Sequence, residues 1–270
     1  MLTYESLIEQ AKSRSMPSTK IRGILREYLQ ILILKELYKI DAGKKLLFTG
    51  GTYLRLVHNL RRFSEDLDFN TNDITVKEFE ILLEKVKNEL KRINIKSEVQ
   101  FAHWRNMYVS KLIFPEIERA YNVASKYSGK GGIIIKVETN KQKRKIKSKT
   151  QVISGFGEFY PCICTDRSIL FADKIDALDK KSRARHIYDV VFMLSSNCPI
   201  DRSTLKALGI KKDPLIVVAN RIKSFSKSEL KRQAEALRPF LFDESEAELV
   251  ANAQDIIPTL IEKYEPEKKK

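Results

Sequence analysis

Two aspartates separated by one residue, Asp66 and Asp68, are the side chains with the clearest chemical potential in this sequence. They lie in the octet R-F-S-E-D-L-D-F at residues 62–69. On a β-strand, residues two apart point to the same side, so the two carboxylates would lie together while Leu67 and Phe69 face the core. Adjacent carboxylates repel one another unless a cation lies between them, and Mg²⁺ is the expected cation. A solvated strand face is the alternative.

A pair of glycines precedes this octet, in the segment L-L-F-T-G-G-T at residues 46–52. A strand that breaks at Gly50 and Gly51, followed by a helix from Thr52, would let the backbone approach a bulky anion. The amides of the turn and of the helix start direct their positive dipole ends at that anion. The segment therefore predicts a triphosphate site, although paired glycines are also common in ordinary tight turns.

A third carboxylate is expected on a neighbouring strand if two metal ions are to support an in-line displacement. Glu138 is the candidate, because it ends the apolar, β-branched stretch G-G-I-I-I-K-V-E at residues 131–138. A buried strand over these residues would project its carboxylate beside Asp66 and Asp68. A surface glutamate at a strand end is the alternative.

Two further charged residues lie in segments that have the pattern of buried helices. Lys174 is surrounded in sequence by apolar residues, so its ammonium group is near apolar surface and can meet a phosphate in a cleft. Asp189 precedes V-V-F at residues 190–192, and an acidic residue in such a place needs a partner. That partner could be Lys174, an arginine or a substrate amine, and an ordinary salt bridge between helices is the alternative.

The hydrophobic pattern divides the chain into a mixed first half and a helical second half. Strands are expected at residues 45–48, 66–69, 97–104, 107–114 and 132–138, and an amphipathic helix at residues 75–93. Later helices are expected at residues 168–181, 185–195, 201–208, 227–237 and 245–263. The fold class is therefore α+β, with a mixed sheet and flanking helices plus a C-terminal helical bundle.

This pattern places a domain boundary near residue 160. Residues 1–160 would form the catalytic core with an N-terminal helical lead-in, and residues 161–270 would form a helical domain that completes the active site. No apolar run approaches the roughly 20 residues that span a bilayer. The N-terminus M-L-T-Y-E-S-L-I-E-Q lacks the order of a secretory signal. We therefore expect a cytoplasmic protein with no membrane partner.

The balance of charges points to a polyanionic partner. The chain has 50 lysines and arginines against 35 acidic residues, a net charge of +15, which is typical of nucleic-acid-binding surfaces. A lysine-rich solubilising surface is the alternative. The densest basic run is N-K-Q-K-R-K-I-K-S-K at residues 140–149, and the residues expected to contact RNA are Lys141, Lys143, Arg144, Lys145, Lys147 and Lys149.

The order of these motifs resembles the AbiEii/AbiGii family of nucleotidyltransferase toxins, which belongs to the DNA polymerase β superfamily. The resemblance extends over residues 46–194, through G-G-T, R-F-S-E-D-L-D-F, K-V-E, A-D-K-I-D-A-L and Y-D-V-V-F-M-L. It implies a polymerase β-type core that binds an NTP and Mg²⁺ and transfers a nucleotide with release of pyrophosphate. It also implies a toxin whose antitoxin is separately encoded.

The resemblance assigns roles by position. Residues 50–52 would cradle the triphosphate, and Asp66, Asp68 and Glu138 would be the ligands of a two-metal site. Glu138 would also help to deprotonate the attacking hydroxyl.

Lys174 and Asp189 receive roles in the same way. Lys174 would neutralise phosphate charge, and Asp189 would orient the lysine or the acceptor. Family members often carry Arg-Asp before the Tyr-Asp segment, whereas here Arg185 is followed by His186. The resemblance therefore assigns no role to His186.

The acceptor of the nucleotide is open at this point. Some toxins similar to this chain add nucleotides to the 3′ CCA end of tRNA, and the net charge of +15 fits an RNA acceptor. A nucleotidyltransferase that modifies a protein or a small molecule is one alternative. A non-catalytic nucleic-acid-binding protein is another, and the intact carboxylates argue against it.

Overall fold

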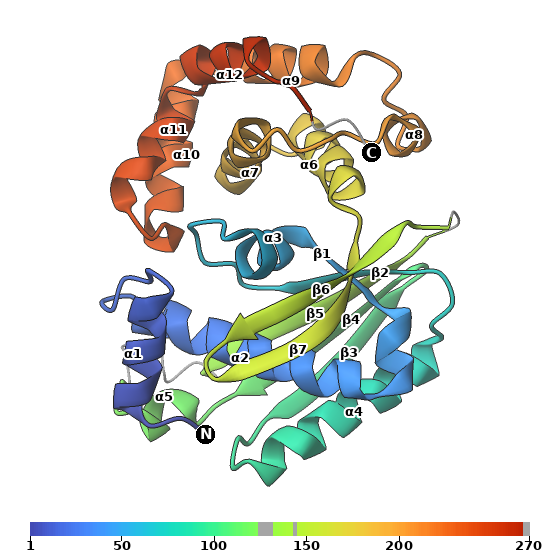
Figure 1. Ribbon diagram of the computed structural model, residues 1–270, viewed down its shortest axis with the longest axis vertical. Coiled ribbons are helices and arrows are strands. Elements are labelled where there is room, and N and C mark those ends of the chain that lie inside the picture. Colours follow the sequence, from blue (N-terminus) through green and yellow to red (C-terminus); the bar gives the residue numbers. More distant parts are fainter. Residues whose placement is uncertain (124–131, 143–144, 267–270) are drawn as a thin grey trace. The chain divides into compact units, whose positions relative to one another are not determined.

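A computed structural model describes residues 1–123, 132–142 and 145–266 of the chain (Figure 1). The chain divides into two compact units. The sheet unit comprises residues 1–59 and 63–165, and the helical unit comprises residues 60–62 and 166–270. The expected boundary between residues 160 and 161 lies inside the last strand of the sheet unit, which continues to Thr165.

The described part of the sheet unit is built on one seven-stranded mixed sheet with the order β3-β4-β5-β2-β1-β7-β6. Its strands are β1 (Leu47–Thr49), β2 (Leu67–Thr71), β3 (Glu98–Trp104), β4 (Met107–Phe114), β5 (Ile133–Lys141), β6 (Ser148–Gly155) and β7 (Glu158–Thr165). The pairs β2–β5 and β1–β7 are parallel, and the other neighbours are antiparallel. The expected α+β class is therefore confirmed.

Two long helices, α2 (Ile21–Lys39) and α4 (Val76–Arg92), pack on each other and against the sheet. Helix α4 matches the helix expected at residues 75–93, and a capping box fixes its start: Thr75 Oγ1 accepts from the Glu78 N–H, and the Glu78 carboxylate accepts from the Thr75 N–H. Helix α3 (Gly50–His58) follows β1 directly, and its buried Arg55 pairs with Glu27 of α2 (Figure 1). The shorter elements are α1 (Tyr4–Ser13), η1 (Asp41–Lys45) and α5 (Ile117–Ala120).

Alternation along the central strands decides which side chains lie on each face of the sheet. Leu67 and Phe69 of β2 are buried, and so are Ile135 and Val137 of β5. Side chains between them point the other way. Asp68 of β2, together with Lys136 and Glu138 of β5, therefore lies on the face opposite the apolar core.

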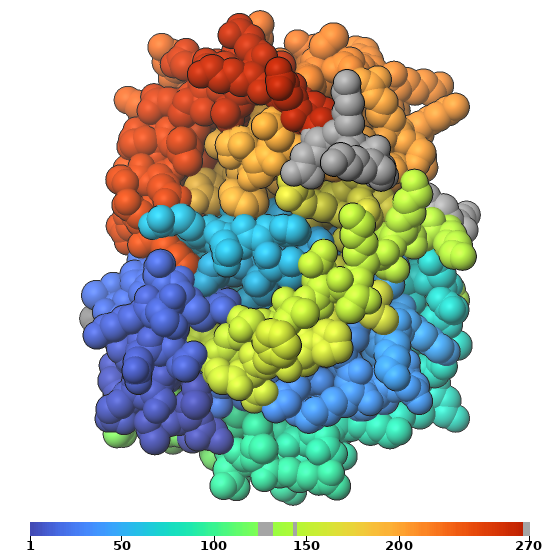
Figure 2. All heavy atoms as spheres, viewed as in Figure 1, coloured from blue at the N-terminus to red at the C-terminus, as the bar shows by residue number. Residues whose placement is uncertain are grey.

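The β6–β7 hairpin is a part of the sheet that the hydrophobic pattern did not predict. It forms the edge of the sheet and lies on the surface of this unit, as the yellow-green segment of Figure 2 shows. Val152 is 47% exposed and Phe159 is 76% exposed, so apolar residues lie on both faces of the hairpin, although Tyr160, Cys162 and Cys164 form a buried alternating face. Pro161 also argues against a strand, but β7 pairs with β1 at Cys164, beyond this proline.

The helical unit contains α6 (Arg167–Lys180) and α7 (Ala184–Ser195), which pack on each other. Its other elements are α8 (Arg202–Ala207), α9 (Pro214–Lys223), α10 (Lys227–Leu237), η3 (Arg238–Phe240), η4 (Glu244–Ala247), α11 (Glu248–Ala251) and α12 (Ala253–Glu262). Residues 60–62 join this unit through a bridge between Arg62 and Leu241 and a hydrogen bond from the Phe242 N–H to the Arg61 carbonyl. Within the described residues, no helix has the length and apolar character needed to cross a membrane.

One expected helix needs correction, and one observed helix was not predicted. The single helix expected at residues 245–263 is three shorter elements, because the chain leaves helical geometry at Asn252 between α11 and α12. Helix α9 was not predicted, since its run I-V-V at residues 216–218 is β-branched and lowers helix propensity. Asp213 caps this helix by accepting from the Leu215 N–H, and Pro214 occupies the first turn.

Candidate active site

Strand register brings two of the three expected carboxylates together in the sheet unit. Asp68 pairs with Thr49 of β1 on one side and with Glu138 of β5 on the other. Asp66 lies one residue before the start of β2, which begins at Leu67 and not at Asp66 as expected. The octet therefore supplies one carboxylate from the strand and one from the residue that leads into it.

Lys136 is a member of this cluster that sequence reasoning missed. Its Nζ lies 2.6 Å from Glu138 Oε1. The hydrogen bond to Glu138 raises the pKa of Lys136, and the charges of Asp66 and Asp68 act in the same direction. The ammonium group thus belongs to the electrostatic environment of all three carboxylates. Its position two residues before Glu138 on one strand was the available signal, because it places both side chains on one face.

The start of helix α3 lies directly beside Asp68. Gly50 has a φ of +81°, and a Cβ at this position would lie 2.2 Å from Asp68 Oδ2. Only glycine allows the turn to approach the carboxylate this closely. The preceding Thr49 makes no side-chain hydrogen bond to the helix, and its buried Oγ1 finds no hydrogen-bond partner in the part of the chain that the structure describes. The first amides of α3 are therefore open to an anion.

Thr52 has a structural contact that the sequence did not reveal. Its side chain is fully buried, and its hydroxyl donates to the backbone carbonyl of Asp66 at 2.5 Å. This bond ties the first turn of α3 to the residue that leads into β2. Because the hydroxyl is used in this bond, the backbone amide of Thr52 is the group that could contact the triphosphate expected from the sequence.

The donor set of this cluster fits a hard divalent cation. Carboxylate oxygens are the ligands that Mg²⁺ prefers, and Asp68 and Glu138 are in register on adjacent strands. Among the described residues, no group of three His, Cys, Asp or Glu side chains is already close enough to hold a metal ion. The ammonium group of Lys136 supplies positive charge at these carboxylates.

The helical unit contains a second charged cluster, centred on Asp189. This carboxylate is fully buried, and Arg62 holds both of its oxygens, with Nε–Oδ1 and Nη2–Oδ2 distances of 2.8 Å each. Lys174 Nζ lies 2.7 Å from Oδ2. Burial alone would raise the pKa of Asp189, but the charges of Arg62 and Lys174 outweigh it and hold the pKa well below its ordinary value. The ion pair between Lys174 and Asp189, one of the alternatives that the sequence left open, is therefore present, and Arg62 is a second partner of Asp189.

His186 lies next to this cluster and is 9% exposed. Neither ring nitrogen has a hydrogen-bond partner within the described ranges. Burial lowers the pKa of His186 to about 3; the positive charges of Lys174, Arg185 and Lys181 act in the same direction, and Asp189 opposes them. The imidazole is therefore neutral at physiological pH.

Acidification is expected to destabilise the helical unit through His186. Below about pH 6.5 the unfolded chain binds a proton on this residue that the folded protein does not take up until about pH 3. The free energy of unfolding should therefore fall by about 1.4 kcal/mol for each pH unit below about 6.5. Chemical denaturation from pH 7 to 5 checks this, with His186→Gln as the non-titrating control. Equal slopes for the two proteins would contradict the account.

The basic run is described only in part. Lys141 ends β5 and Lys149 lies in β6, while Lys145 and Lys147 are exposed between them. Lys143 and Arg144 lie outside the described residues.

Comparisons with known proteins give the same family as the motifs. A family model described as the nucleotidyl transferase AbiEii toxin of type IV toxin–antitoxin systems matches residues 32–262. No curated protein matches the sequence. Two solved structures share the fold, as their coverage and TM-scores show. The MenT4 nucleotidyltransferase toxin of Mycobacterium tuberculosis is 18% identical and has a TM-score of 0.63. The match covers 97% of this chain and 90% of the MenT4 chain. JHP933 of Helicobacter pylori is 19% identical and has a TM-score of 0.52. The match covers 90% of this chain and 93% of the JHP933 chain.

The family match spans both units and every motif described above, from the glycine pair to Asp189. The resemblance expected from the sequence is thereby confirmed. The chain belongs to the AbiEii nucleotidyltransferase toxin family, and it is a nucleotidyltransferase.

Proposed function

We propose that this enzyme transfers a nucleotide from an NTP to an RNA acceptor, such as the 3′ end of tRNA, in a Mg²⁺-dependent reaction. The observation that carries the proposal is the register that pairs Asp68 with Glu138 beside the glycine start of α3. This arrangement combines open backbone amides for phosphate oxygens with carboxylates for cations. Both are needed where a triphosphate reacts.

The reaction forms one bond and breaks another at the α-phosphorus. The oxygen of an acceptor hydroxyl attacks this phosphorus, and the bond to the bridging oxygen of the β-phosphate breaks, so pyrophosphate leaves. The hydroxyl proton passes to a carboxylate, and Glu138 is the proposed base. The amides at residues 50–52 hold the triphosphate in place.

Asp66, Asp68 and Glu138 would hold the magnesium ions of a two-metal site. When bound, Mg²⁺ supplies charge neutralisation for the triphosphate and for the attacking and leaving oxygens. Lys136 neutralises part of the carboxylate charge, which reduces the repulsion within the cluster before the substrate binds.

For the helical unit we propose the role that the family resemblance implies, in which this unit completes the active site. Lys174 would neutralise phosphate charge, and Asp189 would orient the lysine. The observed Lys174–Asp189 ion pair supports the second part, because a doubly anchored carboxylate fixes the position of the ammonium group.

Net charge supports RNA over the other acceptors. Lysines and arginines exceed acidic residues by 15, and four residues of the basic run are on described parts of the sheet unit. These are Lys141, Lys145, Lys147 and Lys149. A protein or a small molecule as acceptor remains the alternative reaction. An RNA acceptor would be met in the cytoplasm, and type IV toxin–antitoxin membership implies an antitoxin as a functional partner.

The acceptor is tested by incubating the protein with Mg²⁺, each α-labelled NTP in turn, and total tRNA. Label is expected on the RNA. A matched sample of tRNA, whose terminal ribose has been oxidised to remove the 3′-hydroxyl, should take up none. Label on oxidised and intact tRNA alike would contradict the 3′-end proposal, and label on protein alone would favour the alternative acceptor.

Gly50→Ala is expected to lower nucleotide transfer about 10²-fold, because the new Cβ would displace the Asp68 carboxylate and misplace the reacting groups. Single-turnover kinetics measures this loss. Gly157→Ala is the control, since Gly157 has a similar φ of +77° but open space around its Cβ. Similar losses in the two variants would show that backbone strain, not the contact with Asp68, is responsible.

A further inference from the structure

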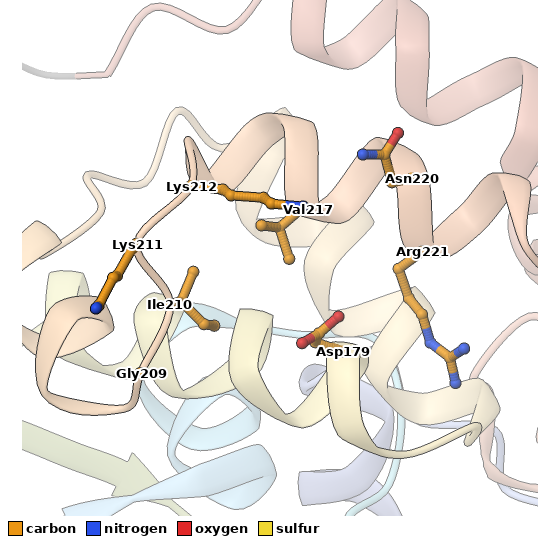
Figure 3. Close-up of a pocket in the computed structure, with 8 residues that line it drawn as sticks. All are labelled: Asp179, Gly209, Ile210, Lys211, Lys212, Val217, Asn220 and Arg221. Carbon is orange, nitrogen blue, oxygen red and sulfur yellow. The ribbon is translucent and has the colours of Figure 1, made fainter.

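A basic groove in the helical unit has no role in the reaction described above. It consists of two hollows, of about 490 Å³ and about 370 Å³, formed by α8, the loop after it and α9. The hollows share Ile210, Lys211 and Lys212, so they adjoin. Figure 3 shows the larger one, with Lys212 reaching across towards Val217 above Asp179 of α6. We call the two hollows together the α8–α9 groove.

The smaller hollow is lined by cations and apolar residues. Arg202, Lys206, Lys211 and Lys212 border it, and its lining includes no acidic residue. The three lysines are exposed, so they are accessible to a large ligand. Arg202 is also exposed, and its partner Asp213 lies 3.2 Å away at the surface. Such a concentration of ammonium groups favours phosphates.

The larger hollow has a different chemistry, because it mixes donors, an acceptor and apolar surface. Ile210 and Val217 supply the apolar surface, Asn220 supplies an amide, and Asp179 supplies a carboxylate. A carboxylate disfavours a phosphate but accepts hydrogen bonds from the exocyclic amino group of a nucleobase. The volume of about 490 Å³ is within the range of small-molecule sites, about 300–1,000 Å³.

Arg221 gives this hollow a fixed guanidinium plane. Its Nε donates to the Leu178 carbonyl at 3.1 Å, and its Nη2 donates to Ser182 Oγ at 2.7 Å. The guanidinium also lies over the ring of Phe225, 4.7 Å from the centroid. A guanidinium held in this way is pre-organised, and guanidinium planes stack with unpaired bases.

We propose that the α8–α9 groove binds a single-stranded segment of the RNA acceptor, with phosphates at Lys206, Lys211 and Lys212 and one base in the larger hollow. The inference rests on the proposed RNA acceptor. Apolar surface, a guanidinium plane and a single carboxylate beside a row of cations match a nucleotide chain better than an acidic peptide, which has no flat base to fill the hollow.

The phosphate part is tested with the full-length protein and labelled oligocytidylate, by measuring affinity across a range of salt concentrations. The triple variant Lys206→Glu, Lys211→Glu, Lys212→Glu should bind at least about tenfold more weakly. It should also reduce the slope of log affinity against log salt by about 2, roughly 0.7 for each lost contact to a single strand. The matched control reverses three exposed lysines of the same unit, Lys227, Lys231 and Lys263, and thus changes the net charge equally.

The base part is tested with Asp179→Ala. Wild-type protein should prefer oligocytidylate over oligouridylate by about tenfold, because cytosine has an amino group that a carboxylate can accept from and uracil does not. The variant should bind both oligonucleotides with nearly equal affinity. A wild-type protein without preference would overturn the base assignment.

The outcomes separate the groove from the proposed function. We call the Lys206→Glu, Lys211→Glu, Lys212→Glu protein the groove variant. If wild-type protein labels tRNA while the groove variant and the control variant lose the same affinity for oligocytidylate, the groove proposal is wrong and the RNA acceptor stands. If wild-type protein neither binds nor labels RNA, both proposals fail. If polyglutamate binds to the wild-type protein more tightly than RNA does, and the groove variant no longer binds polyglutamate, the surface binds an acidic protein. That result also overturns the inference. Support requires a raised KM for tRNA at an unchanged kcat in the groove variant alone.

Discussion

Asp68→Asn is expected to reduce nucleotide transfer by about 10³-fold while the protein stays folded. The substitution removes the carboxylate that lies between Thr49 and Glu138 and against Gly50, so a cation ligand is lost at the point where charge develops. It keeps the shape of the side chain. Because it also relieves repulsion from the neighbouring carboxylates, the melting temperature should stay the same or rise.

The measurement is the rate constant of nucleotide transfer in single-turnover assays, together with thermal unfolding of the same preparations. Asp73→Asn is the matched control, because Asp73 is an exposed aspartate shortly after β2, and its activity should equal that of wild-type protein. Asp66→Asn should resemble Asp68→Asn. Near-normal turnover of Asp68→Asn, or of wild-type protein in excess EDTA, would rule out the metal-binding role of the octet.

Asp189→Asn is expected to destabilise the helical unit by about 3–5 kcal/mol, because it leaves the buried charges of Arg62 and Lys174 without their counter-ion. Denaturant unfolding measures the loss. Glu235→Gln is the control, since it breaks an exposed pair with Arg238 and should change the free energy of unfolding by less than about 1 kcal/mol.

A triple variant separates the structural role of this cluster from the catalytic one. Replacing all three charges, as Arg62→Met, Lys174→Met and Asp189→Leu, should restore most of the stability, because no buried charge is left unpaired. If Lys174 serves the reaction, this stable protein should still transfer nucleotides poorly. Normal turnover of the triple variant would make the cluster purely structural, and an unchanged stability of Asp189→Asn would contradict the buried ion pairs.

Local signals predicted the parts of the site that depend on short stretches of chain. The glycine pair, the alternation around Asp68 and the apolar run before Glu138 each follow from rules for one strand or one turn. The α4 capping box was present in the sequence as Thr75 and Glu78, three residues apart. These features specify what each segment does, without stating which segments meet.

Features that depend on distant segments could not be predicted in the same way. The parallel pairing of β2 with β5 sets the Asp68–Glu138 register, although α4, β3, β4 and α5 lie between these strands in the chain. Arg62 begins the octet that contains Asp66, yet it belongs to the helical unit and holds Asp189, which is 127 residues away. No periodicity in either segment indicates that partnership. The β6–β7 hairpin was missed because the exposed apolar residues Val152 and Phe159 obscure the buried alternation of Tyr160, Cys162 and Cys164.

The α-label of each NTP and the release of pyrophosphate, followed together in the presence of Mg²⁺ and tRNA, test the central claim most directly. We expect one pyrophosphate for each nucleotide that becomes attached to RNA, with both signals lost in Asp68→Asn and retained in Asp73→Asn. Release of inorganic phosphate in place of pyrophosphate, or label on RNA that survives in Asp68→Asn, would contradict nucleotide transfer at this carboxylate site.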